Sequence, residues 1–289
     1  ELSYDGDPAD PAARVVGARD LGRVDIVLPL LHGPYGEDGT IQGLLEMAGV
    51  RYVGCGVASS AVSMDKHLTK VVLAGAGIDV GRWELITPLQ WEADQGACLE
   101  RAAALGFPVF VKPCRAGSSV GISKVESREG LAVAVKEAQN HDPRVIVEAG
   151  VVGREVECGV LGGRSDWRSA TAPLGEIEVP DGEFYDYEHK YVDDVVGLVC
   201  PAEVAPAYEE RVRETALRAF DALECEGLAR VDFFLDEDSG TVLVNEVNTM
   251  PGFTPISMFP QMWAAAGVDY PSLIDALLEE AAARTVGLR

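Results

Sequence analysis

The sequence predicts a protein of mixed α+β and α/β class, in which strands and helices alternate along 289 residues. Apolar runs of roughly four to eight residues, bounded by turn residues, alternate with longer segments of helical periodicity. Two of these runs, 228–235 and 241–247, flank the turn-rich segment 236–240 and predict a β-hairpin. A chain of this length can bury substantial cores and is expected to form two or three domains.

The predicted elements follow from this periodicity and from the turn residues between them. Residues 1–23 are polar and rich in Pro, Ala and Asp, so we expect a loop there. Apolar runs predict strands, besides the hairpin, at 25–31, 52–53, 108–112, 119–125, 145–148, 155–161, 167–173 and 195–199. Longer periodic segments predict helices at 40–48, 65–74, 91–105, 128–139, 206–223, 258–266 and 271–283, the second of them with Asp65 as its N-cap.

The composition argues against several kinds of partner and site. The net charge of −23 and the pI of about 4.4 argue against nucleic acid or anionic membranes as partners. No stretch is long and apolar enough for a transmembrane helix. The six cysteines contain no Cys-x-x-Cys pair, which argues against a zinc site and favours free thiols in the cytoplasm.

The hairpin carries a candidate metal site. We expect Leu235 to pair with Thr241 across the turn. Because side chains alternate along a strand, one face then carries the following residues: Arg230, Asp232, Val244, Glu246 and Asn248. Carboxylate and amide oxygens are hard ligands, so we predict Asp232, Glu246 and Asn248 as ligands of Mg²⁺ or Mn²⁺. A solvent-exposed face without a metal would show the same alternation and is the alternative.

A candidate phosphate site follows the apolar run 107–111. Lys112 comes directly after this run, and an ammonium group at the end of a buried strand is costly unless an anion meets it. The segment 116–121, Ala-Gly-Ser-Ser-Val-Gly, has glycines that allow backbone N–H groups to approach a phosphate closely. The pattern fits neither the Walker A motif nor the dinucleotide-binding motif, and an ordinary turn is the alternative.

Further motifs occur in a fixed order along the chain. They are Leu31–Thr40 (LHGPYGEDGT), Met64–Lys66, Val111–Pro113 with Gly117–Ser119, Phe184–Tyr187 with Lys190–Tyr191, Arg230–Phe234, and Asn245–Gly252 followed by Ser257–Met258. With these motifs, from about residue 25 to the C-terminus, the chain resembles the D-alanine–D-alanine ligases of the ATP-grasp superfamily. The resemblance implies an ATP-grasp fold with a truncated N-terminal doubly wound domain, because the family's Gly-Gly-x-Ser-x-Glu segment is not found before residue 25.

The resemblance also implies three domains. Residues 1–63 would form the truncated substrate-side domain, 64–152 the central ATP-grasp subdomain, and 153–289 the C-terminal subdomain with the metal and catalytic residues. An uncovered apolar strand at 25–31 would promote aggregation, so we expect the natural protein to be longer by at least one βα unit.

The resemblance assigns roles to individual residues. For ATP it implies the following contacts: Lys66, Lys112, Ser119, Glu148, Ala149, Val151, Glu155, Phe184, Tyr185 and Lys190. In this set Glu148 would accept a hydrogen bond from the adenine amine. For catalysis and the two amino acid substrates it implies another set: Arg230 and the Gly252 N–H at the oxyanion, Ser118 bonded to Tyr191, His32 beside the first alanine, and Ser257 with the Met258 N–H at the second carboxylate.

The implied function is an ATP-dependent ligase that joins two D-alanine molecules through an acyl phosphate, for peptidoglycan synthesis. The implied protein is a cytoplasmic homodimer. An alternative within the same fold is a ligase of D-alanine to D-lactate, for which His189 would be the relevant loop residue, whereas Tyr191 favours an amine as the second substrate. Because the first family motif is not found, a non-catalytic nucleotide-binding module is the second alternative.

Overall fold

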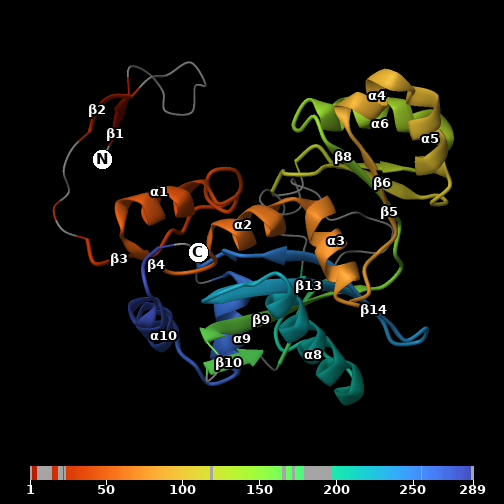
Figure 1. Cartoon of the computed structure of the whole chain (residues 1–289). Coiled ribbons are helices and arrows are strands. Elements are labelled where there is room, and N and C mark those ends of the chain that lie inside the picture. Colours follow the sequence, from red (N-terminus) through yellow and green to blue (C-terminus); the bar gives the residue numbers. More distant parts are fainter. Residues whose placement is uncertain are drawn as a thin grey trace.

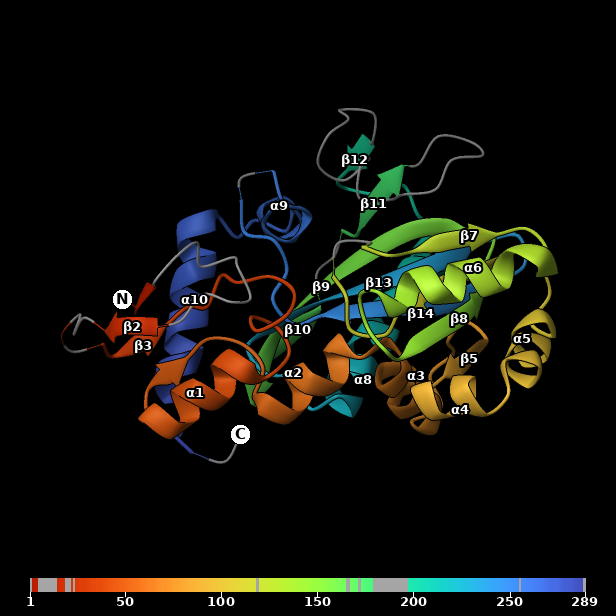
Figure 2. The same ribbon diagram turned by 90° about the horizontal axis from the view of Figure 1, so that it is seen from above.

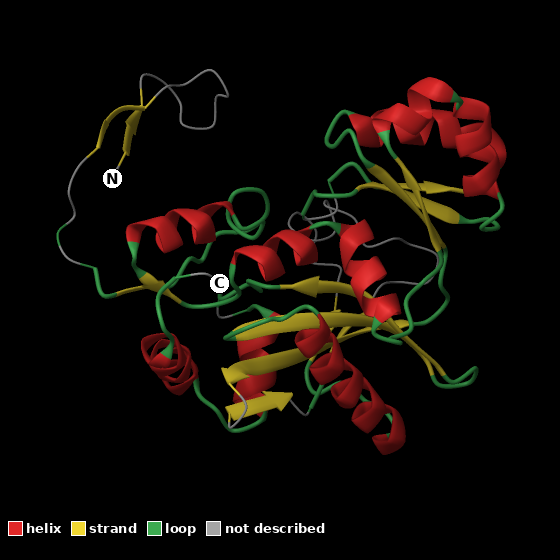
Figure 3. Cartoon of the chain, in the orientation of Figure 1, coloured by secondary structure: helices red, strands yellow, loops and turns green. Residues whose placement is uncertain are grey.

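The computed structural model describes residues 2–4, 15–18, 22, 24–117, 120–164, 167–170, 173–178, 197–254 and 256–287. Within these residues the chain packs around three hydrophobic clusters. Two of them each lie on one face of an antiparallel sheet, and the third lies where the last two helices meet the N-terminal unit. Figure 1 shows the smaller sheet and its helices at the upper right, above the larger sheet, and Figure 3 shows the same arrangement by secondary structure.

Among the described residues, the larger sheet has six strands, and they pair antiparallel. Its order is β12 (Gly197–Val199), β11 (Gly175–Glu178), β9 (Arg154–Arg164), β13 (Leu228–Asp236) and β14 (Thr241–Asn248), with β10 (Trp167–Ala170) paired to β9. One face is apolar, because Val156, Val231 and Phe233 alternate with polar neighbours and pack on helix α8 (Pro206–Ala222).

The smaller sheet has four antiparallel strands. Their order is β5 (Trp83–Ile86), β8 (Val145–Ala149), β6 (Val109–Pro113) and β7 (Ser123–Val125). Helices α4 (Pro88–Ala93), α5 (Gln95–Ala103) and α6 (Arg128–Gln139) cover one face (Figure 1). Strand β6 shows how this face forms, because Val109 and Val111 are buried in the core while Phe110 and Lys112 lie on the opposite face.

Part of the N-terminal region lies beside the last helix, which contacts two of its short strands (Figure 2). Strands β1 (Leu2–Tyr4) and β2 (Val15–Ala18) pair antiparallel, and strands β3 (Ile26–Val27) and β4 (Arg51–Tyr52) pair parallel across helix α1 (Thr40–Ala48). Helices α9 (Met258–Ala265) and α10 (Tyr270–Ala283) share a core with this region and with one end of the larger sheet. That core includes Val53, Leu228, Met250, Phe259 and Leu277.

Helices α2 (Val57–Met64) and α3 (Lys66–Gly75) connect the N-terminal region to the smaller sheet, and α3 contributes Leu73 to the core of the larger sheet. Helix α3 begins after Asp65, whose carboxylate accepts from the backbone N–H groups of His67 and Leu68, both at 3.1 Å. The predicted N-cap is therefore confirmed. The predicted boundary at residue 64 separates two adjacent helices, and the division into three domains stays a prediction.

The smaller sheet begins and ends at neighbouring positions. Trp83 in β5 pairs with Glu148 in β8, and the Ala149 N–H donates to Arg82 O at 3.0 Å. Just before this unit, Val80 forms a bridge to the edge strand β14 of the larger sheet. The chain therefore enters and leaves the smaller unit at one corner.

The first predicted strand is shorter in the structure. Only Ile26–Val27 of the predicted segment 25–31 pair with β4. Pro29 has no N–H for pairing, and the Leu31 N–H donates to Pro29 O at 2.8 Å, which turns the chain. The loop predicted at 1–23 is wrong in part, because β1 and β2 lie within it.

Two further elements differ from the prediction. The helix predicted at 91–105 is two helices, because Asp94 begins a new one by accepting from the Ala97 N–H at 2.9 Å. The strand predicted at 119–125 begins only at Ser123, after a turn in which Gly121 has a φ of 71°. Helix α2 and strands β5 and β11 are absent from the predicted elements, since they are short and lack a clear hydrophobic period.

The predicted hairpin is present, but its register differs at the turn. Asp236, rather than Leu235, pairs with Thr241. A shift of one residue moves every side chain of a strand to the other face of the sheet. This shift alone would separate the polar side chains of β14 from those of β13.

A β-bulge at Asn245 reverses the shift. Phe233 pairs with Val244 whereas Asp232 pairs with Glu246, so Asn245 is the additional residue. Val244 is therefore buried in the core, and its predicted place on the polar face is wrong. The bulge brings Glu246 beside Asp232, as the predicted metal site requires.

The start of helix α4 offers a test of local stabilisation. Thr87 accepts from the Gln90 N–H at 3.3 Å, and the Gln90 side chain accepts from the Thr87 N–H at 2.9 Å, which forms a capping box. We expect Thr87→Ala to lower the free energy of unfolding by about 1 kcal/mol, measured by urea denaturation. Thr87→Ser keeps the hydroxyl and should retain most of the stability. An unchanged unfolding midpoint in Thr87→Ala would contradict this role of the cap.

Candidate active site

A cavity of about 580 Å³ lies between the open faces of the two sheets. Strands β9, β13 and β14 form one wall, and β6 contributes to the other. Helices α2 and α3, strands β11 and β12, and loops from the N-terminal and C-terminal regions also line the cavity. The wall contains these predicted site residues: His32, Lys66, Lys112, Glu155, Arg230, Asp232, Glu246, Asn248, Gly252, Ser257 and Met258. The fold thus brings the predicted phosphate, metal and second-alanine residues into one place.

Other predicted residues are not part of this wall. Glu148 and Ala149 lie at the end of β8, Val151 follows shortly after, and none of the three lines the cavity. The remaining predicted residues lie outside the described part of the chain: Ser118, Ser119, Phe184, Tyr185, Lys190 and Tyr191. His189 lies there too.

The polar face of the hairpin is held together by hydrogen bonds. Arg230 donates to both carboxylate oxygens of Asp232, at 2.7 Å each, and Asn248 Nδ2 donates to Asp232 Oδ2 at 2.9 Å. From β9, Glu157 forms an ion pair with Arg230 at 3.2 Å. Bidentate pairing with arginine fixes the plane of a carboxylate, so the orientation of Asp232 is set by its neighbours.

The donors on this face fit Mg²⁺. Asp232 and Glu246 supply carboxylate oxygens and Asn248 an amide oxygen, all of the hard type that this cation prefers. Among the described residues, no cluster of three or more His, Cys, Asp or Glu side chains could hold a metal. A cation at this face would therefore need further oxygens from water and phosphate, which is how Mg²⁺ binds at nucleotide sites.

Glu148 is buried between two lysines. Lys112 Nζ lies 2.6 Å from Glu148 Oε2, and Lys70 Nζ lies 2.8 Å from Glu148 Oε1. Burial alone would raise the pKa of Glu148, but Lys112 and then Lys70 hold it far below its ordinary value of 4.5. Burial also disfavours the charged form of Lys112, yet the Glu148 carboxylate raises the pKa of that lysine. Glu148 is thus an anion that meets Lys112, and the contact of Lys112 with phosphate stays a prediction.

Lys66 connects helix α3 to the glycine-rich loop after β6. Its Nζ donates to Ala116 O at 2.8 Å, and its backbone N–H donates to Cys114 O at 3.0 Å. A Cβ atom on Gly117 would lie 3.5 Å from Gly33 Cα, so this loop touches the N-terminal loop. Two loops that carry predicted site residues therefore meet at one edge of the cavity.

The opposite edge of the cavity is formed by the segment after β14. A Cβ atom on Gly252 would lie 2.7 Å from Ser257 Oγ, so a larger residue here would displace the Ser257 hydroxyl. Ser257 Oγ accepts from the Thr254 N–H at 3.0 Å. His32 Nδ1 donates to Met250 O at 3.1 Å, which connects the N-terminal loop to the same segment.

Comparison with known proteins decides the family. The family model of the D-ala D-ala ligase C-terminus matches residues 72–279, and that of the N-terminus matches residues 5–55. The chain belongs to the D-alanine–D-alanine ligase family. The ligase is 54% identical over 288 residues to the D-alanine–D-alanine ligase of Kineococcus radiotolerans, covering 98% of this chain and 75% of that protein. It is 56% identical over 274 residues to that of Pseudarthrobacter chlorophenolicus, covering 94% and 72%.

Solved structures agree with this assignment. The D-alanine–D-alanine ligase from Coxiella burnetii aligns with a TM-score of 0.79 and 36% identity, covering 98% of the ligase and 73% of that chain. The VanG D-Ala:D-Ser ligase from Enterococcus faecalis aligns with a TM-score of 0.81 and 39% identity, covering 93% and 74%. The ATP-grasp fold class and the ATP-dependent ligase class are therefore confirmed. The family match begins at residue 5, which corrects the expected start near residue 25.

Three residues in or near the cavity are absent from the predicted set, and two of them line it. Lys70 lies one helical turn after Lys66, and this spacing indicates a shared helix face. Glu157 lies two residues after Glu155, so alternation along β9 places both on the cavity side. Glu37, within the Leu31–Thr40 motif, also lines the cavity, where burial raises its pKa and its Oε2 accepts from the Gly33 N–H at 2.6 Å.

Proposed function

We propose that the ligase uses ATP to activate the carboxylate of one D-alanine and joins it to the amine of a second, supplying the dipeptide for peptidoglycan. One observation carries the proposal: Lys66 and Lys112 line the same cavity as Asp232, Glu246 and Asn248. Ammonium groups near one wall and hard metal ligands on the facing hairpin suit a triphosphate between them, since phosphoryl transfer needs positive charge around the phosphates.

Asp232, Glu246 and Asn248 would hold Mg²⁺, or Mn²⁺ in its place, next to the phosphates. When bound, the cation neutralises the charge that develops as the γ-phosphoryl group transfers. Arg230 prepares this face by holding Asp232 in one orientation through two hydrogen bonds of 2.7 Å.

The reaction proceeds in two balanced steps. The carboxylate of the first D-alanine attacks the γ-phosphorus of ATP, and ADP leaves, which gives an acyl phosphate. The neutral amine of the second D-alanine attacks the acyl carbon, the resulting oxyanion returns to a carbonyl as the bond to phosphate breaks, and the proton lost by the nitrogen leaves with the phosphate. We assign Arg230 and the Gly252 N–H as donors to that oxyanion, and such donors contribute about 10²-fold or more in rate.

We assign further residues to the two amino acids and to closure over the phosphates. His32 would lie beside the first D-alanine, and Ser257 with the Met258 N–H would receive the carboxylate of the second. Lys190 would close over the γ-phosphate, and Ser118 with Tyr191 would shape the second pocket. These last three assignments rest on the sequence, because the residues lie outside the described part of the chain.

Phosphate release tests the proposal. With ATP and Mg²⁺, D-alanine should support rapid release and D-alanyl-D-alanine should be the main product near neutral pH. L-Alanine should support none. D-Lactate and D-serine as second substrates test the D-lactate alternative and the activity named for the VanG relative. A depsipeptide as the main product would overturn the amine assignment, and ADP binding without phosphate release would favour the non-catalytic alternative.

We further propose that the ligase is a homodimer and acts in the cytoplasm, where thiols such as those of its six cysteines stay reduced. Helix α1 presents Leu44 and Met47, which are 59% and 90% exposed, and a partner would cover them. Light scattering should give twice the chain mass of 30.8 kDa. None of the helices among the described residues could cross a membrane.

A further inference from the structure

Four N–H donors converge on Asp142, in the turn between α6 and β8. This carboxylate is 3% exposed. It accepts from the Arg115 N–H at 3.0 Å, Arg115 Nε at 2.8 Å, Arg115 Nη2 at 2.7 Å and the Arg144 N–H at 3.0 Å. Burial alone would raise the pKa of Asp142, but Arg115 and the Arg144 N–H lower it, so the group is charged at neutral pH.

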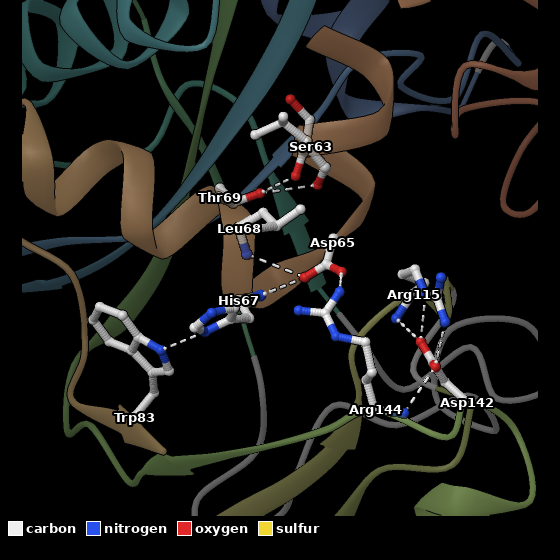
Figure 4. A network of polar contacts seen from close by, with 10 residues as sticks. Ser63, Asp65, His67, Leu68, Thr69, Trp83, Arg115, Asp142 and Arg144 are labelled. Atoms are coloured by element: carbon white, nitrogen blue, oxygen red, sulfur yellow. Dashed lines mark hydrogen bonds and ion pairs between the residues drawn. The ribbon is translucent and has the colours of Figure 1, made fainter. Parts of the chain in front are cut away.

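A second carboxylate extends this network to helix α3. Arg144 Nη1 donates to Asp65, the buried N-cap of α3, and Arg144 O accepts from the Cys114 N–H at 3.0 Å. Cys114 O in turn accepts from the Lys66 N–H at 3.0 Å. Figure 4 shows Asp65 at the side chain of Arg144, and Asp142 between Arg115 and Arg144. The network joins the end of β6, the turn before β8 and the start of α3.

The joined segments carry groups that face the cavity. Ala116 and Gly117 line the cavity directly after Arg115, and Ala116 O accepts from Lys66 Nζ at 2.8 Å. Asp142 and Arg115 are not part of the cavity wall. Any influence of Asp142 on a bound nucleotide must therefore pass through the backbone of residues 115–117 and through Lys66.

We propose that Asp142 is a positioning residue for the polyphosphate of the nucleotide. Its carboxylate fixes Arg115, and with it the cavity-facing backbone of Ala116 and Gly117 and the ammonium group of Lys66. The proposal rests on the proposed function, which places the phosphates of ATP at this edge of the cavity. Small displacements of groups that position a substrate reduce binding and rate strongly.

Positioning and stability can be separated here. The Arg115 side chain is 49% exposed, whereas Asp142 is 3% exposed. Arg115→Ala removes the Nε and Nη2 donors but keeps the backbone N–H of residue 115 and that of Arg144, so we expect a folded protein with a lower unfolding temperature and a less firmly held cavity edge. Asp142→Asn removes the charge while it keeps the size of the side chain, so it tests the carboxylate itself.

The experiment combines steady-state kinetics with calorimetric titration of Mg²⁺ and ADP. In Arg115→Ala and Asp142→Asn we expect the KM for ATP and the Kd for ADP to rise by about tenfold or more, with the KM for D-alanine unchanged. Arg115→Lys keeps one charged donor and should recover part of the loss. Arg128→Ala is the matched control, because Arg128 pairs with Glu100 on the same unit but outside the cavity wall. Its KM for ATP and its Kd for ADP should equal those of the wild type.

Two results would overturn the proposal. If the variants unfold at a lower temperature but bind ADP as the wild type does, Asp142 stabilises the fold without positioning the nucleotide. If Asp142→Asn does not fold, the test rests on Arg115→Ala. A KM for ATP and a Kd for ADP equal to those of the wild type in that variant would then overturn the proposal. A wild type that neither binds ADP nor releases phosphate with D-alanine would refute the proposed function itself, which distinguishes the two failures.

Discussion

Glu246→Gln is expected to abolish turnover while the protein stays folded. The substitution keeps the volume of the side chain but removes one negative charge and one hard oxygen ligand next to Asp232. We expect kcat to fall by at least about 10²-fold, the scale seen when one group that stabilises transition-state charge is lost. Phosphate release at saturating ATP, Mg²⁺ and D-alanine measures the effect.

The same hairpin supplies the control for this variant. Glu237 lies at its turn, where it forms an ion pair with Arg154 at 3.1 Å, far along the strands from Glu246. Glu237→Gln makes the same chemical change and should leave kcat close to that of the wild type. Circular dichroism and the unfolding midpoint establish that both variants are folded. A folded Glu246→Gln enzyme with near-native phosphate release would refute the assignment of Glu246 as a metal ligand.

The second large effect is expected for Glu148→Gln. Lys70 is buried and the Lys112 side chain is 11% exposed, and both ammonium groups lie within 2.8 Å of this carboxylate, so the variant leaves them without their counter-ion. Breaking a buried ion pair by removing one partner costs about 3–5 kcal/mol in the free energy of unfolding. We expect a loss of that size at pH 7, measured by urea denaturation. Glu84→Gln is the control, since Glu84 pairs with Arg101 near the surface of the same sheet and should change stability little.

The pH dependence of this effect has a defined sign. The lysines lower the pKa of Glu148 in the folded state, so its charged form stabilises the fold above the ordinary value of 4.5. That stabilisation is lost as the pH falls below 4.5, because the folded protein must then accept a proton that it disfavours. The Glu148→Gln variant lacks this titration. The difference in stability between wild type and variant should therefore narrow in acid, and a constant difference would contradict the buried triad.

The sequence pattern predicted which residues share the polar face of the hairpin, but not the register or the bulge that bring them together. Alternation along the strands placed Asp232, Glu246 and Asn248 together, and all three line the cavity. The register behind that prediction was wrong at the turn, and the bulge at Asn245 compensated for the error. A bulge depends on how two strands meet in the whole sheet, so a pattern within one strand does not indicate it.

Contacts between distant elements were harder to predict than the motifs. The N-cap at Asp65 follows from residue type and position within a few residues, and it is confirmed. The partners of Glu148 come from α3 and β6, and the side-chain partner of Asp142, Arg115, comes from the loop after β6. No local pattern encodes such pairs, because they form only after the elements pack.

The position at which the chain enters and leaves the smaller sheet affects how this segment can be exchanged between related enzymes. The first strand of this sheet along the chain, β5, pairs with the last, β8, through Trp83 and Glu148, so the two ends of the unit are adjacent. A segment whose two ends are adjacent can be inserted into a host protein, or exchanged between relatives, without rerouting the host backbone. We therefore expect residues 83–149 to be exchangeable as a unit, and chimaeras that swap them between ligases are expected to fold when Val80 and its bridge to β14 are kept.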